Sequence, residues 1–144
     1  MKPDSCQLWN PRVAALWSLL FSPAFGAWVH AANWRVLGRP DKAQAARRWS
    51  YLMVATVLLA GVAGALFETY ARHLPSVAAA AWMAAWCGFP AREQCRYVTD
   101  NVGLNYRRRP WWPALLGGIA GWALLALLSL GAATLLVRAG GFYI

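Results

Sequence analysis

Long apolar segments alternate with short basic ones along this chain, and the alternation predicts its fold class. The apolar segments contain few ionised side chains and cover residues 13–36, 51–67, 75–89 and 114–137. A helix of about 20 apolar residues spans the hydrocarbon core of a bilayer, which is about 30 Å thick. The pattern therefore predicts an all-α fold, a small multi-pass transmembrane helix bundle that forms one integral membrane domain over residues 1–144.

Three of these segments are expected to cross the membrane once each. Segment 114–137 is long enough by itself, and segment 51–67 becomes long enough when its flanking residues lie at the interfaces. Segment 75–89 is short, but it is apolar on every side, whereas a helix that lies on a membrane surface has a polar face. We therefore predict a short crossing there, with Pro75 near its start and Pro90 at its end.

The first segment, 13–36, has two interpretations because Ser22 and Pro23 interrupt it near the middle. It is either one proline-kinked crossing or a re-entrant pair of half-length helices hinged at these residues. The re-entrant pair agrees better with the positive-inside rule, since it leaves Lys2 and Arg12 on the same side as most basic residues. Against it, a broken helix needs protein around its freed backbone groups, and a chain this small offers little cover.

The basic residues predict the orientation of the bundle. They gather in segments 37–50 and 90–113, which the positive-inside rule places in the cytoplasm. The anionic inner leaflet attracts such cations, by about 1 kcal/mol for each Lys or Arg. The residues that we expect at the lipid headgroups are Arg47, Arg48, Arg107, Arg108 and Arg109.

Both basic segments are expected to contain a short helix. Pro40 and Asp41 favour a helix start, and this helix runs on into the second crossing. In the other segment, Cys95, Val98 and Val102 fall at positions i, i+3 and i+7. This spacing predicts a short amphipathic helix lying on the inner leaflet.

Composition supports a membrane location and argues against a nucleic-acid partner. Of 144 residues, 60% are hydrophobic and 13% are charged, whereas charged residues make up about a quarter of a typical soluble domain. The net charge of +9 flanks apolar segments and forms no separate basic domain, so we expect no nucleic acid to bind. An excess of arginine over lysine, with abundant Ala, Gly and Trp, is typical of GC-rich bacterial genomes and indicates a bacterial inner membrane.

Residues that carry chemistry are scarce. The three cysteines lack metal-binding spacing, and no protease, hydrolase or phosphate-binding motif is present. A pairing of Ser18 or Ser22 with His30 would lack a third group to position it and an evident oxyanion hole. We therefore expect no enzymatic activity, no cofactor and no metal site.

Small residues and a few polar ones are the candidate contact positions within the apolar segments. Small residues let helices approach closely in lipid, and they serve either to pack the bundle or to hold a protein partner or second copy. The small-residue candidates are Gly117, Gly121, Ala60, Gly61 and Gly64. The intramembrane polar candidates are His30, Asn33 and Glu68.

Together these features favour a protein that acts by contact. We predict a non-catalytic protein of the bacterial inner membrane that binds another membrane or membrane-active protein. Two forms of this function fit equally well: an immunity protein against a membrane-acting toxin, and an accessory subunit of an envelope complex. The alternative is a small channel or transporter subunit whose site is lined by the half-helices around Pro23, His30 and Asn33.

Overall fold

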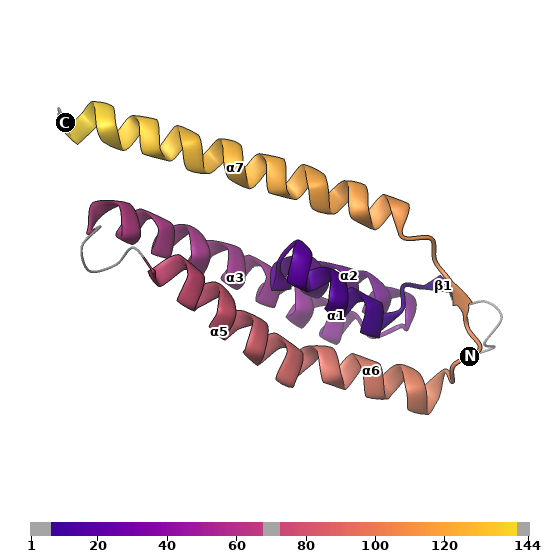
Figure 1. Cartoon of the computed structure of the whole chain (residues 1–144). Coiled ribbons are helices and arrows are strands. Elements are labelled where there is room, and N and C mark those ends of the chain that lie inside the picture. Colours follow the sequence, from indigo (N-terminus) through magenta and orange to yellow (C-terminus); the bar gives the residue numbers. More distant parts are fainter. Residues whose placement is uncertain (1–6, 68–72, 141–144) are drawn as a thin grey trace.

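The computed structural model describes residues 7–67 and 73–140, which are mostly helical (Figure 1). The elements in chain order are β1 (Gln7–Leu8), α1 (Pro11–Leu20), α2 (Pro23–Val36), α3 (Pro40–Leu66), α5 (Leu74–Gly88), α6 (Pro90–Asn101), β2 (Arg107–Arg108) and α7 (Trp112–Gly140). The helices agree with the predicted class. The short parallel pairing of β1 with β2, which places Leu8 opposite Arg108, was not predicted.

Proline and a polar cap define where the first two helices begin. α1 begins at Pro11, and the side-chain oxygen of Asn10 accepts a hydrogen bond of 3.0 Å from the N–H of the second helical residue. α2 begins at Pro23, and the Ser22 hydroxyl accepts one of 3.2 Å from the N–H of the third. Both arrangements satisfy N–H groups that have no partner within the helix.

α3 joins a basic segment to an apolar one in a single helix. Pro40 and Asp41 occupy its first turn, as predicted, and it continues without a break to Leu66. Its 27 residues span about 40 Å at a rise of 1.5 Å per residue. Pro90 separates α5 from α6, again as predicted, although the two helices follow each other without a loop.

α1 and α2 form an antiparallel hairpin, called the hairpin below. Between them, the backbone of Ser22 is extended, with φ 162° and ψ 161°. Residues before Ser22 contact residues about equally far after it. Gly26 lies against Ser18, and farther from the turn Asn33 is hydrogen-bonded to Trp9. The chain thus turns back on itself at Ser22, as the re-entrant alternative expects, and does not form one kinked helix.

Other helices cover the hairpin. α3 packs along α2, and α6 contacts both α1 and α2, with further contacts from α5 (Figure 1). The expectation that so small a chain offers little cover for a broken helix is therefore wrong. The physical reason is that α6, which was predicted to lie on the lipid surface, packs instead against protein.

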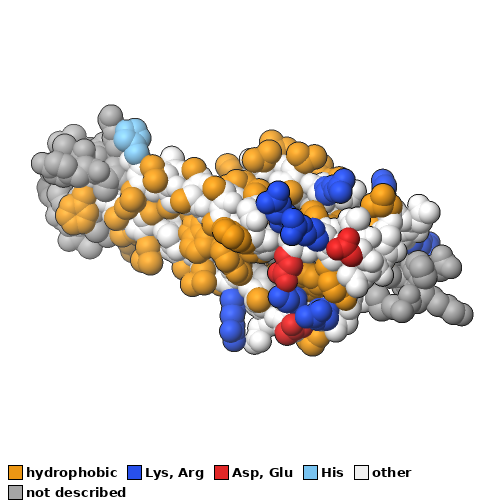
Figure 2. All heavy atoms as spheres, turned by 90° about the horizontal axis from the view of Figure 1, so that it is seen from below, with side chains coloured by type: hydrophobic (Ala, Val, Ile, Leu, Met, Phe, Trp, Pro, Cys, Tyr) orange, Lys and Arg blue, Asp and Glu red, His pale blue; other side chains and the backbone are white. Residues whose placement is uncertain are grey.

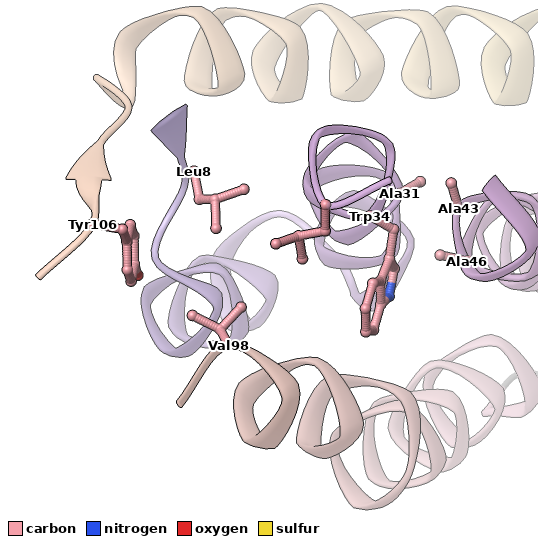
Figure 3. Close-up of a cluster of buried hydrophobic side chains, with 8 residues drawn as sticks. Leu8, Ala31, Trp34, Ala43, Ala46, Val98 and Tyr106 are labelled. Carbon is pink, nitrogen blue, oxygen red and sulfur yellow. The ribbon is translucent and has the colours of Figure 1, made fainter. Parts of the chain in front are cut away.

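Three clusters of buried apolar side chains surround the hairpin, and each includes residues of α2. The first lies between the hairpin, α3, α6 and the strands (Figure 3) and contains Leu8, Ala31, Trp34, Leu37, Ala43, Ala46, Val98 and Tyr106. The second joins the hairpin to the start of α7 and contains Trp9, Ala14, Phe25, Val29 and Ala114. The third joins α2 to α3, α5 and α6 and contains Ala24, Ala27, Met53, Trp86 and Ala91.

Charged and apolar surfaces lie at opposite ends of the molecule. On the face seen in Figure 2, Lys, Arg, Asp and Glu side chains gather over one half, and hydrophobic side chains cover much of the other. We call the strands, the hairpin, residues 40–50 of α3 and all of α6 the charged end. The remainder of α3, together with α5 and α7, forms the apolar end.

Within residues 7–67 and 73–140, two helical stretches are long and apolar enough to cross a membrane, judged by length and composition. Leu74–Asn101 combines α5 with α6 and has a mean hydropathy of 1.2, and Trp112–Ala132 lies in α7 and has one of 1.9. In the most apolar 18-residue part of each stretch, 11% of that part is buried against the rest of the protein.

Candidate functional site

A network of buried amide groups joins the hairpin to β1 and α6. The Asn33 side chain pairs with both backbone groups of Trp9: its Nδ2 donates to the Trp9 carbonyl at 2.8 Å, and its Oδ1 accepts from the Trp9 N–H at 3.1 Å. Its Nδ2 also donates to Gln94 Oε1 at 3.3 Å, and Gln94 Nε2 donates to the His30 carbonyl at 2.9 Å. Asn33 and Gln94 are both buried.

This network holds the entry and exit of the hairpin together. The Asn33 amide bonds to the N–H and carbonyl of Trp9, just after β1, as a neighbouring strand would. It thereby satisfies backbone groups that would otherwise be buried without partners. A buried polar group without a partner destabilises a fold by about 1–3 kcal/mol. We therefore assign Asn33 and Gln94 a structural role in fixing the hairpin against α6.

His30 lies beside this network and is almost completely buried. Its Nε2 is 3.4 Å from the Pro11 carbonyl oxygen, and its ring packs at 5.0 Å and 60° against the Trp86 ring. Its Nδ1 is buried and has no hydrogen-bond partner among the described residues. A neutral ring that donates from Nε2 to Pro11 fits this environment, because a buried charge needs a partner.

The two arms of the hairpin approach each other closely at Gly26. A Cβ atom there would overlap Ser18 Oγ and the ring of Trp86, so no larger residue fits without displacement. The Ser18 hydroxyl, which was weighed as a partner of His30, donates to the Ala14 carbonyl at 2.8 Å. Gly26 thus allows close packing of α1, α2 and α5.

Side chains from α3 and α7 complete the hydrogen bonding around the hairpin break. Trp122 Nε1 donates to the Phe21 carbonyl at 2.8 Å, and the Ser50 hydroxyl donates to the Ala24 carbonyl at 3.0 Å. The Phe21 carbonyl follows the last turn of α1, where carbonyls have no partner within the helix, so the Trp122 bond satisfies a group that the break exposes. The break is therefore covered from two sides.

The small residues of α7 have unequal surroundings. Gly118 faces the hairpin, where a Cβ would lie 3.0 Å from the Phe21 ring, and at Gly117 it would lie 3.8 Å from the Trp28 ring. At Gly121, no atom lies within 4 Å of the same position. A cavity of about 210 Å³ opens here, lined by Phe21, Ser22, Ala24, Phe25, Trp28, Ser50, Val54, Gly117, Gly118, Gly121, Trp122 and Leu125.

The small residues of α3 also have unequal surroundings. Ala60 is buried, Gly64 is half-buried, and a Cβ at Gly61 would have no atom within 4 Å. Gly61 and Gly121 are thus both without a packing neighbour. Glu68, the remaining polar candidate of this region, lies outside the described residues.

The arginines predicted at lipid headgroups are all exposed at the charged end. Arg47 and Arg48 project from α3, and Arg107 and Arg108 form β2. The Arg109 guanidinium lies 4.2 Å from the centre of the Trp9 ring, in a cation–π contact.

A second and larger cavity lies at the charged end, between α3 and the junction of α5 with α6. Its volume is about 610 Å³, and it is lined by Trp34, Lys42, Ala45, Ala46, Trp49, Gly88, Phe89, Pro90, Arg92, Glu93 and Arg96. Lys42 Nζ and Glu93 Oε1 form an ion pair of 2.6 Å across it. Neither cavity is lined by His30 or Asn33.

Gln94 is the residue of the amide network that sequence reasoning missed. Part of the predicted apolar stripe packs inward: Val98 is buried, Cys95 is half-buried and Val102 packs against the first cluster. The fully buried residues of α6 are Ala91, Gln94 and Val98. These positions also have the spacing i, i+3 and i+7. The helical spacing of Ala91 and Val98 could have indicated this buried face, but the polar residue between them, Gln94, interrupts the apolar pattern.

Among the described residues, no group of His, Cys, Asp and Glu is arranged to hold a metal ion. The sequence matches no known family model, and no curated protein or solved structure shows detectable similarity to it.

Proposed function

We propose that this chain is a multi-pass protein of the bacterial inner membrane that acts without catalysis, by binding another membrane or membrane-active protein. The observation that carries the proposal is that α7 is strongly apolar but is hardly buried. This helix has an 18-residue stretch of mean hydropathy 1.9, yet only 11% of that stretch is buried in the protein.

A membrane location explains this combination better than the alternatives. The core helix of a soluble protein passes the same test of length and hydropathy, but it is mostly buried, and a secretory signal sequence lies near the N-terminus. α7 is largely exposed and follows all the other helices. Large exposed side chains along it include Leu116, Ile119, Leu124, Leu127, Leu128 and Leu130. Such a surface is stable in lipid and is a liability in water.

The gathering of charge at one end supports an orientation with that end in the cytoplasm. The hairpin then enters from the cytoplasmic side and returns to it, so that β1, the start of α3, α6 and β2 lie together at the inner leaflet. Exposed arginines of α3 and β2 are then placed at the headgroups, as expected from the sequence.

A protein partner is supported by the glycines of α7 that lack neighbours. Glycine in a helix is less favourable than alanine by about 1 kcal/mol, and in lipid its benefit is the close approach of a second helix. Gly118 has this benefit inside the protein, whereas Gly121 and Gly131 have no atom within 4 Å of an added Cβ. Gly121 opens on the cavity beside the hairpin, so a partner helix on this side of α7 would place a side chain in that cavity and would pack closely at Gly131.

Both partner classes that the sequence predicts, a membrane-acting toxin and a component of an envelope complex, remain part of the proposal. An immunity protein would hold a toxin that acts at the inner membrane, and an accessory subunit would hold a component of an envelope complex. The competing function, a channel or transporter subunit, has less support. Asn33 has hydrogen-bond partners in Trp9 and Gln94, and neither His30 nor Asn33 lines a described cavity.

The test is purification of the tagged protein from its native host in mild detergent or nanodiscs, followed by mass spectrometry. We expect a stoichiometric membrane or membrane-active protein to be retained. Gly121→Leu should release it, whereas Ala123→Leu, on the opposite side of α7, should not. A clean monomer or homo-oligomer that carries only lipid would contradict the proposal.

A further inference from the structure

The cavity between α3 and α6 has the size of a small-molecule site. Its volume of about 610 Å³ lies within the range of about 300–1,000 Å³ that is typical of such sites. α3 lines it with one face of its first turns, since Lys42, Ala45, Ala46 and Trp49 recur at helical spacing. The wall opposite is the junction of α5 with α6.

The cations of this cavity outnumber its single carboxylate. Lys42 is paired with Glu93 at 2.6 Å, which offsets the only negative side chain of the lining. In the described part of the chain, Arg92 and Arg96 form no ion pair. They lie four residues apart on α6, where two like charges repel each other and weaken the helix. A bound anion would relieve this repulsion.

Guanidinium groups favour phosphate over other anions. Arg presents a planar set of donors that matches two oxygens of one phosphate group, and two such residues on one helix face can address the same group. Lys42 lies opposite them, on α3. The cavity therefore brings together cations from two helices that face a common space.

Aromatic side chains complete the lining on the side of the apolar end. Trp49 packs edge-on against Trp82 of α5 at 5.4 Å, and Phe89 is exposed at the helix junction. Tryptophan at the boundary between charged and apolar surfaces is typical of the level of lipid headgroups. The cavity thus has a cationic side and an aromatic side, like the headgroup and the first carbons of a phospholipid.

From this arrangement we infer that the cavity is a binding site for the phosphate of one anionic phospholipid, held by Arg92, Arg96 and Lys42. It differs from the diffuse contact of headgroups with Arg47 and Arg48, because it is a discrete site of one lipid. The inference shares the membrane location with the proposed function, but it does not require the protein partner.

The experiment compares two double variants that remove the same charge. Arg92→Gln/Arg96→Gln alters the cavity, and Arg47→Gln/Arg48→Gln alters exposed arginines of α3 outside its lining. Full-length protein in detergent at physiological salt is titrated with phosphatidylglycerol and, separately, with zwitterionic phosphatidylethanolamine, and bound lipid is counted by native mass spectrometry. We expect one phosphatidylglycerol per protein, an affinity about tenfold lower in the cavity variant, and a change of about twofold or less in the other.

Two further arms keep the test decisive. Arg92→Lys/Arg96→Lys preserves charge and removes the planar donors, so it should weaken lipid binding while thermal unfolding stays close to that of the wild type. Glu93→Gln frees Lys42 and should leave lipid binding unchanged or tighter. Inorganic phosphate at millimolar concentration should not displace the lipid.

Three results would overturn the inference. One is equal loss of lipid binding in the two double glutamine variants, which would mean diffuse attraction to the charged end. Another is equal binding of the zwitterionic lipid. The last is displacement by inorganic phosphate, which would assign the site to a soluble phosphate compound. None of these bears on whether a protein partner co-purifies, so the proposed function is judged separately.

Discussion

Asn33 and Gln94 at the charged end are almost fully enclosed, with their amides bonded to backbone groups, whereas Leu127 in α7 at the apolar end is 67% exposed. The charged end thus has a packed interior of its own, with a specific hydrogen-bond network. The apolar end has little internal packing and depends on what surrounds it. The two ends should therefore respond very differently to the same kind of substitution.

The largest difference is expected between a buried and an exposed tryptophan. Trp86 of α5 is completely buried against the hairpin, and Trp112, at the start of α7, is 65% exposed. Trp86→Ala should lower the free energy of unfolding by about 3–5 kcal/mol because it leaves a cavity, and Trp112→Ala should cost less than about 1 kcal/mol. Unfolding in mixed micelles measures both, and similar losses would mean that α5 does not pack on the hairpin through Trp86.

Glycines provide a second matched pair. Gly26→Ala should destabilise by about 1–3 kcal/mol because the new methyl group overlaps Ser18 and Trp86. Gly61→Ala meets open space and should stabilise α3 by up to about 1 kcal/mol through helix propensity. Thermal unfolding in detergent compares them. A tolerated Gly26→Ala would contradict the close approach of the hairpin arms.

The amide network should show coupling between its members. Asn33→Leu leaves both Trp9 backbone groups without their partner and should cost about 1–3 kcal/mol, and Gln94→Leu should behave similarly. In a double-mutant cycle, the double variant should lose less than the sum of the single losses, by about 0.5 kcal/mol or more. Asn101→Leu, on the exposed side of α6, is the control. Strictly additive losses would show that the two amides act separately.

The smallest effect is expected where α7 meets the hairpin break. Trp122→Phe keeps the ring but removes the donor to the Phe21 carbonyl, which should cost about 0.5–1.5 kcal/mol. Trp112→Phe is the control, since its side chain is exposed. A loss as small as the control would mean that water or lipid headgroups already satisfy this carbonyl.

Local signals in the sequence predicted much of the fold. Pro40 with Asp41 marked the start of α3, Pro90 marked the junction after α5, and Ser22-Pro23 marked the break in the first segment. Each of these depends on residues within a few positions of one another. Such signals are readable because proline and helix caps act on the neighbouring backbone.

The contacts that fix the hairpin could not be predicted in the same way. Asn33 meets Trp9 and Gln94 across 24 and 61 positions of sequence, and Trp122 reaches Phe21 across 101. The pairing of β1 with β2 joins segments that carry no strand pattern. Polar residues such as Gln94 become interior only when distant backbone groups need them, so periodicity identified Val98 on the packing face of α6 but not Gln94.

In the proposed orientation, the hairpin enters the membrane and returns, so that both of its ends lie with the charged end in the cytoplasm. Single cysteines at Asn10, Arg108 and Arg138, in a protein whose native cysteines are replaced by serine, test it directly with a membrane-impermeant maleimide. The account predicts that in intact spheroplasts only the cysteine at position 138 is labelled, and that in inverted vesicles those at 10 and 108 are labelled together. Labelling of position 10 from the outside would mean that the first segment crosses the membrane, and it would contradict the account.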